Sequence, residues 1–449
     1  MSVFRLAALF ARPGAGSRAA LILPIVTFAV VSALVLVVLA GVQAFFTWTD
    51  DLAGIYQALA VIALALLVVP LLGLGRSAAR LSARRRDDRL STLRLLGATG
   101  GTVAALTVIE STALALIGAL VGVIGYAALV PEVGLIPFRG SPLGASALWM
   151  PVLEIVVVVA VLLVLAAASA ALGLRAVIIS PLGVRTKQSA PKAHWIRLVI
   201  GLGVIIASVG AVSLIGRIGG SEAVAIAVAM LILVLAFGGT LAILNLVGPW
   251  VIGIYARREV RSAKNAQRLI AARAILESPK AAWRQVSGVA MTSFMAVFAG
   301  TGLALTNMGQ SSGVDAAGLE LLDDIRTGIF LTIAISFVMV ACSVGVNQAS
   351  GILDRRDLYV SLDRLGMPVT AMDAARSRAV MSPLRIVTIG SALCAAIVIL
   401  PLTGIAMIVA PASILTIVVS LAAGIGLVWV VLRATRPELT RVLAEPERV

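Results

Sequence analysis

Residues 20–46 have the sequence ALILPIVTFAVVSALVLVVLAGVQAFF, a run of 27 residues without a charged side chain. An α-helix rises about 1.5 Å per residue, so about 20 apolar residues cross the roughly 30 Å hydrocarbon core of a bilayer. This run is therefore long enough to span a membrane, and Arg5, Arg12 and Arg18 precede it. Because the apolar part of a cleaved signal has only about 7–15 residues, we predict an uncleaved anchor.

The whole chain has the composition of an integral membrane protein. It has 449 residues, of which 60% are hydrophobic and 13% charged, and its mean hydropathy is +1.08. Soluble domains carry about 45–50% apolar and about 25% charged residues, so a soluble enzyme and a disordered chain are excluded. Cys342 and Cys394 lie in apolar runs, which excludes a disulfide framework, and the single His194 excludes a histidine-rich metal site.

Ten runs of the chain meet the length requirement for a membrane-spanning helix. Their predicted limits are Ala20–Phe46, Leu52–Leu74, Val103–Leu129, Ala147–Leu174, Ile196–Ile215, Ala223–Val247, Val286–Leu305, Ile325–Ala349, Leu384–Leu402 and Ala410–Leu432. None shows the strict alternation of a β-barrel strand. We therefore predict an all-α, polytopic membrane protein with about ten transmembrane helices embedded in the lipid bilayer.

The distribution of positive charge predicts the orientation. With both termini in the cytoplasm, only three of the 36 Lys and Arg residues fall on outer segments, namely Arg139, Arg217 and Arg326. Cytoplasmic loops of membrane proteins carry an excess of Lys and Arg. The same rule accounts for the net charge of +15, so we expect no nucleic-acid partner.

Matching motifs in the two halves indicate an internal repeat. The matched pairs are Pro13/Arg18 with Pro279/Arg284, residues 86–97 with residues 355–366, and Pro181/Arg185 with Pro437/Arg441. Each half begins inside and runs outward, which predicts parallel repeats related by an axis along the membrane normal. The predicted organisation is a first four-helix repeat (1–185), a joining helix pair (186–256) and a second four-helix repeat (257–449).

Two cytoplasmic loops of this repeat, which we call the elbows, carry the candidate docking residues. The first elbow contains Arg86, Asp88, Leu90, Leu93, Arg94, Leu96 and Gly97, and the second contains Arg356, Asp357, Leu358, Leu362, Leu365 and Gly366. In each, leucines share one helical face and a glycine follows as a helix stop. A short amphipathic helix of this kind suits recognition by another protein. Alternatively, the arginines serve topology and the leucines rest on the membrane interface.

The first elbow resembles a known family. The stretch from Arg84 to Ala98, followed by Glu110, Gly118 and Gly122, is similar to the FtsX-like permease domain of ABC transporters. The resemblance covers residues 52–185 well and residues 325–441 less well. The second half departs from the pattern at three positions, where Asp363, Met367 and Ala379 replace the arginine, alanine and glutamate of the motif.

The resemblance implies a permease subunit in the bacterial plasma membrane, with two separate ATPase subunits docked on its elbows. The chain has no Gly-x-x-x-x-Gly-Lys-Ser/Thr motif, so ATP and Mg²⁺ would be bound by the partner, and we expect neither catalysis nor a cofactor in this chain. Two permease units in one chain resemble the bacitracin-exporter type, although the outer loop between the seventh and eighth helices is short here. The implied cargo is an amphipathic or lipophilic antimicrobial peptide, lipid or drug, exported or extracted from the membrane.

Two acidic residues inside the spans are candidates for coupling or substrate contact. Glu110 either pairs with a cytoplasmic arginine or is solvated at the headgroup level. Glu154 enters the fourth helix from outside, with Arg139 as a candidate partner, and alternatively serves packing. Two other functions remain open: a scaffold that relays ATPase motion to an extracytoplasmic partner, and an ion-driven secondary transporter, for which Glu154 alone gives little support.

Overall fold

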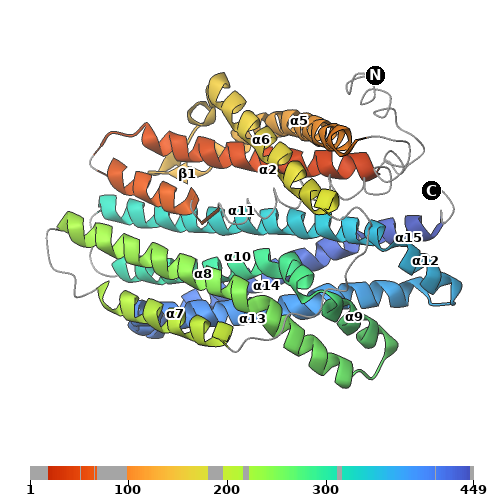
Figure 1. The fold of residues 1–449 in the computed structure, drawn as a ribbon. Coiled ribbons are helices and arrows are strands. Elements are labelled where there is room, and N and C mark those ends of the chain that lie inside the picture. The colour runs from red at the N-terminus through yellow and green to blue at the C-terminus, as the bar shows by residue number, and fades with distance from the viewer. Residues whose placement is uncertain are drawn as a thin grey trace. The chain divides into compact units, whose positions relative to one another are not determined.

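The computed structural model describes residues 19–50, 52–64, 66–67, 99–179, 196–215, 222–310, 316–409 and 411–444. Helices account for 89% of these residues, which confirms the all-α prediction. A hairpin of two-residue strands, β1 (Pro137–Phe138) and β2 (Ser141–Pro142), is the one sheet in this described part (Figure 1). The sequence pattern did not predict it.

The chain divides into two compact units, one of residues 1–188, 345–355 and 441–449 and the other of residues 189–344 and 356–440. Before residue 188 the structure describes α2 (Ala19–Phe46), a helix at Ala53–Leu64, α5 (Gly100–Val133), the hairpin, the 3-10 turn η1 (Ser146–Leu148) and α6 (Val152–Ile179). After it come α7 (Ile196–Ser213), α8 (Glu222–Arg261), α9 (Ala266–Glu277), α10 (Pro279–Gln310), α11 (Ala316–Asp354), α12 (Arg356–Arg364), α13 (Val369–Val409), α14 (Pro411–Ala434) and α15 (Arg436–Ala444).

Seven of the described helices are long and apolar enough to cross a membrane, and Ala53–Leu64 and Val199–Ser213 are shorter apolar helices. Apolar side chains such as Ile124, Val152 and Val164 are largely exposed on these helices, as expected for surfaces that face lipid. The prediction that the fourth run is helical from Ala147 is wrong. Pro151 precedes the first residue of α6, and the preceding residues form η1 and an extended link.

Close packing in the first unit depends on glycines that line α5 where it meets α2. A Cβ atom at Gly118 would lie 2.6 Å from Phe28 Cβ and 2.7 Å from the Ile25 carbonyl oxygen, and one at Gly122 would overlap Ser32. Ser32 Oγ donates a hydrogen bond across the interface to the Ala119 carbonyl oxygen at 3.3 Å. The absence of side chains at Gly118 and Gly122 therefore permits the close approach of α5 to α2.

The core of the second unit forms around α10 and α13, which make the most extensive helix pair of that unit. Val286 of α10 and Leu384 of α13 are fully buried there, together with Val340 of α11 and Val428 of α14. Trp283 Nε1 donates a hydrogen bond of 2.7 Å to Asn245 Oδ1, which ties the start of α10 to α8. In the first unit, the helix pair with the most extensive contact is α2 with α5.

Candidate coupling site

The second elbow forms a helix, α12, that ends in a hydrogen-bonded glycine stop. Gly366 has φ +83°, a left-handed conformation that glycine adopts without steric cost. Its amide donates to the Asp363 carbonyl oxygen at 2.8 Å, and the Met367 amide donates to the Leu362 carbonyl oxygen at 3.0 Å. This pair of bonds is the Schellman motif, so the predicted glycine-terminated helix is confirmed at the second elbow.

Leu358 and Leu362 of α12, with Leu365 directly after its last residue, form an exposed apolar stripe, which we call the α12 stripe. Leu358 is 49% exposed, Leu365 is 82% exposed, and Leu362 between them is half-buried. The face away from the stripe carries Arg356, Asp363 and Arg364. Burying one leucine side chain contributes about 1.5–3 kcal/mol of favourable free energy, so burial of the stripe against a partner would stabilise a complex substantially.

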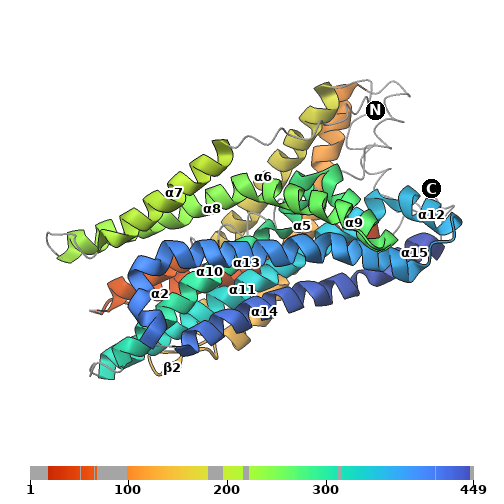
Figure 2. The same ribbon diagram turned by 90° about the horizontal axis from the view of Figure 1, so that it is seen from below.

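A short, ordered connection joins α12 to the helix bundle. Only Met367 and Pro368 separate Gly366 from the first residue of α13, Val369. The amides of Ala371 and Met372 donate to the Pro368 carbonyl oxygen, so regular helix hydrogen bonding begins directly after the stop. Figures 1 and 2 place α9 and α12 at the end of the second unit where α13 begins. A displacement of α12 would therefore act directly on α13.

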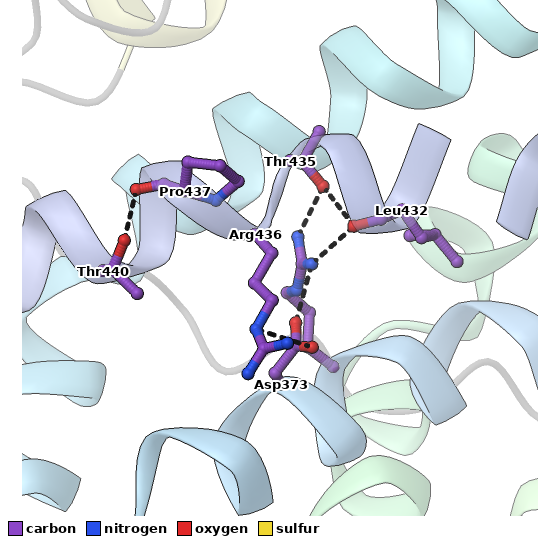
Figure 3. Close-up of polar contacts among 7 residues, drawn as sticks. Asp373, Leu432, Thr435, Arg436, Pro437 and Thr440 are labelled. Carbon is purple, nitrogen blue, oxygen red and sulfur yellow. Dashed lines mark hydrogen bonds and ion pairs between the residues drawn. The ribbon is translucent and has the colours of Figure 1, made fainter. Parts of the chain in front are cut away.

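Two turns into α13, a buried arginine binds the end of α14. Arg376 is 7% exposed, and its guanidinium donates to Thr435 Oγ1 at 2.8 Å, to the Leu432 carbonyl oxygen at 2.9 Å and to Asp373 Oδ1 at 2.9 Å. Arg436, the first residue of α15, places Nε 3.8 Å from the second Asp373 oxygen (Figure 3). We call these five residues the Arg376 cluster. It ties together the beginning of α13, the end of α14 and the beginning of α15.

Sequence reasoning missed the Arg376 cluster. Asp373 and Arg376 are three residues apart, which suits an ion pair on one helix face. That spacing carries no information about Leu432 or Thr435, which lie more than 50 residues further along the chain. The one sequence signal was the presence of Arg376 and Arg378 before the ninth predicted apolar run, which starts at Leu384. The excess of positive charge in cytoplasmic loops also explains arginines at such positions, so they did not indicate a contact with α14.

The other predicted site residues lie elsewhere in the chain. The candidate residues of the first elbow, from Arg86 to Gly97, fall outside the described residues. Glu110 is half-buried on α5. Glu154 lies in the first turn of α6, where its Oε1 accepts a hydrogen bond of 3.1 Å from Gln43 Nε2 of α2. Glu154 thus contacts a neighbouring helix of its own unit.

The expected pairing of Glu154 with Arg139 is wrong, because the β-hairpin directs Arg139 elsewhere. Arg139 and Gly140 have φ of 54° and 69°, the pattern of a two-residue type I′ turn. The guanidinium lies 3.8 Å from the ring centroid of Trp48 and 4.6 Å from that of Tyr56, and it forms an ion pair of 3.0 Å with Asp50. This cluster fastens the hairpin to the loop after α2.

The Asp50 carboxylate responds to this environment. Desolvation alone would raise its pKa, but hydrogen bonds from Arg139 and from backbone amides, with the positive charge of Arg139, lower the pKa below its ordinary value. Asp50 is therefore ionised at neutral pH.

No model of a known protein family matches this chain, and no curated protein matches it either. The geometry of α12 and the Arg376 cluster, together with the motif residues of the first elbow, is therefore the basis for the functional proposal.

Proposed function

We propose that this chain is the membrane permease subunit of an ABC transporter of the FtsX-like type. It couples ATP hydrolysis by separate ATPase subunits to the export or membrane extraction of an amphipathic or lipophilic substrate. The observation that carries the proposal is the α12 stripe: Leu358 on this short helix and Leu365 directly after its end are both exposed. Such a stripe suits insertion into an apolar groove of a partner.

The connection between α12 and the bundle supports a coupling role for this helix. When the ATPase subunits close on nucleotide, the bound α12 pulls on α13 through the two-residue link after Gly366. The Arg376 cluster joins α13 to α14, so the two helices move together. A rigid connection of this kind transmits a displacement because packed helices deform little.

The repeat extends the proposal to a second docking site. The first elbow has leucines at Leu90, Leu93 and Leu96 before Gly97, as the second has Leu358, Leu362 and Leu365 before Gly366. Two elbows imply two ATPase subunits for each permease chain. With ten spanning helices and both termini in the cytoplasm of a bacterium, both elbows face the compartment that contains ATP.

Co-purification with an ATPase tests the docking role. We expect the double substitution Leu358→Asp and Leu365→Asp to abolish recovery of a co-expressed ATPase whose Walker A-bearing reading frame adjoins that of the permease. The introduced charges would have to be buried without partners in the apolar groove, which is costly. Membrane insertion should persist, because α12 contributes no residue to the buried core that is described.

Arg364→Asp is the matched control, because it introduces a negative charge at an exposed position of α12 on the face away from the leucines. It should retain the ATPase. Normal recovery with the double variant, or equal loss with the control, would exclude the stripe as the docking surface. The same substitutions at Leu93 and Leu96 test the first elbow.

A further inference from the structure

Two aromatic rings on the predicted outer side of the first unit enclose a guanidinium group. The ring centroids of Trp48 and Tyr56 are 4.9 Å apart, and the ring planes meet at 84°. The Arg139 guanidinium lies against both rings, 3.8 Å and 4.6 Å from their centroids, and it forms an ion pair of 3.0 Å with Asp50. Two aromatic faces and a carboxylate around one cation form an aromatic cage. We call Trp48, Tyr56 and Asp50 the outer cage.

The outer cage is held by contacts that do not involve Arg139. Phe45, near the end of α2, packs against both rings, with centroids 5.0 Å and 6.1 Å away. Tyr56 is only 4% exposed, so its ring is fixed by its surroundings. The hairpin is anchored separately by Phe138, which is buried and lies 5.1 Å from the Phe45 ring. The cage and the hairpin therefore both stay in place when only the Arg139 side chain moves away.

Arg139 occupies the cage with a strained backbone. Its φ of 54° is the one positive value among the non-glycine residues that the structure describes. The first central position of a type I′ turn favours asparagine, aspartate or glycine, because other side chains clash with the backbone in this conformation. Strain of this kind is concentrated at functional sites and ligand clamps. A plain connection between α5 and α6 does not require an arginine at this position, so the strain points to a role for the guanidinium group.

The occupied cage is accessible from solvent. The side chains of Arg139 and Asp50 are 29% and 49% exposed. Exposed ion pairs and cation–π contacts are individually weak, so together they favour the occupied cage over the vacant one by roughly 10- to 100-fold. A cationic group that arrives from solvent makes the same contacts with the rings and the carboxylate. It therefore competes with the Arg139 side chain for one position.

The lining and the location of the cage define the ligand. Aromatic faces attract guanidinium and ammonium groups, and a carboxylate pairs with either. The predicted outer segments carry more acidic than basic residues, and such a surface attracts cations. The first predicted span ends at Phe46, two residues before Trp48, so an apolar tail on the same molecule reaches the hydrocarbon. The cage thus suits a cationic amphiphile.

We propose that the outer cage binds the guanidinium or ammonium group of a cationic amphipathic molecule, and that Arg139 fills the cage when this ligand is absent. Arg139 is then an intramolecular competitor of the ligand, and the hairpin holds it in position. The assignment of this ligand as the transported substrate rests on the proposed function. The binding itself requires no ATPase and is measured without one.

Calorimetry of the full chain in phosphatidylcholine nanodiscs tests the proposal, with dodecylguanidinium as the probe and empty nanodiscs as the blank. Arg139→Asn vacates the cage and places a residue that the turn prefers, so this variant should fold. We expect it to bind the probe at least about tenfold more tightly than the wild type, because the competitor is removed. Adding Asp50→Asn to this variant should reverse the gain. Dodecylurea, which has a similar shape and no charge, should show no gain with either variant.

Arg326→Gln is the matched control, since it removes one positive charge from an exposed position of α11 on the predicted outer side. It should bind dodecylguanidinium within about twofold of the wild type, because distant exposed charges contribute little. Arg139→Gly, which also suits the turn, provides a second vacated cage. A gain confined to the two Arg139 variants supports the proposal.

Unchanged or weaker binding by both Arg139 variants would overturn the proposal and leave Arg139 as a fastener of the hairpin. An equal gain with Arg326→Gln would overturn it as well, because net charge would then explain the effect. The proposed function fails separately, since normal recovery of the ATPase with the α12 variants contradicts the docking role and does not affect this measurement.

Discussion

Replacement of Arg376 by methionine removes the side chain that joins α13 to α14. Methionine has a similar length and fills the same space, but it donates no hydrogen bond. The wild-type guanidinium makes hydrogen bonds to the Leu432 carbonyl oxygen, Thr435 Oγ1 and Asp373 Oδ1, at 2.8–2.9 Å. In Arg376→Met, these acceptors lose their donor in a buried location.

The expected cost follows from the burial of the cluster. Removing one partner of a buried ion pair costs about 3–5 kcal/mol, because the other charge remains without compensation. Two features reduce the cost here: Asp373 retains Arg436 at 3.8 Å, and Arg376 Nε is buried without a hydrogen bond in the wild type. We therefore expect a loss of about 3 kcal/mol. For a unit of this size, each kcal/mol lowers the melting temperature by about 2–4 °C, so the shift should be roughly 6–12 °C.

Thermal unfolding of the detergent-solubilised chain at a fixed scan rate measures this shift. Arg436→Met is the control, because Arg436 is 51% exposed and its contact with Asp373 is long. Exposed ion pairs contribute about 0–1 kcal/mol, so the control should shift the melting temperature by no more than about 4 °C. If the two variants melt together, the Arg376 cluster does not hold α13 to α14. In that case, the proposed coupling from α12 to the bundle loses its structural basis.

Two further predictions concern the first unit. Gly118→Ala should reduce the yield of folded protein in size-exclusion chromatography, because the added Cβ would lie 2.6 Å from Phe28 Cβ. Gly125→Ala is the control and should match the wild type, because its Cβ would lie 3.5 Å from Ala33 Cβ, an ordinary contact distance. Equal yields of the two variants would show that α2 and α5 do not pack through Gly118. The pKa of Asp50 is lower in the folded chain than in the unfolded chain, so its ion pair with Arg139 stabilises the fold at any pH above the unfolded pKa. This stabilisation is lost as the pH falls through the folded pKa. Because Arg139 lies against the Trp48 ring, the fluorescence of Trp48 should change below about pH 4. Asp50→Asn should abolish that transition, and its persistence in this variant would assign the change to another group.

Most of the helical architecture was predictable from local sequence. A run of about 20 apolar residues must form a helix in a bilayer, because its backbone groups have no other hydrogen-bond partners there. The glycine stop of α12 was predictable for a similar reason, since Gly366 follows a short amphipathic segment and tolerates a left-handed conformation. The β-hairpin was not predicted, although Arg139-Gly140 between two short strands is a weak turn signal.

The sequence by itself therefore determined the all-α, transmembrane character of the protein and the amphipathic helix at the second elbow. These properties depend on residues within one or two helical turns or on averages over a span. Only the tertiary structure decided that Arg376 binds the end of α14, that Arg139 contacts Asp50 instead of Glu154, and that two aromatic rings enclose the Arg139 guanidinium. Each of these contacts joins side chains far apart in the chain, and the packing of helices, which local pattern does not specify, brings them together.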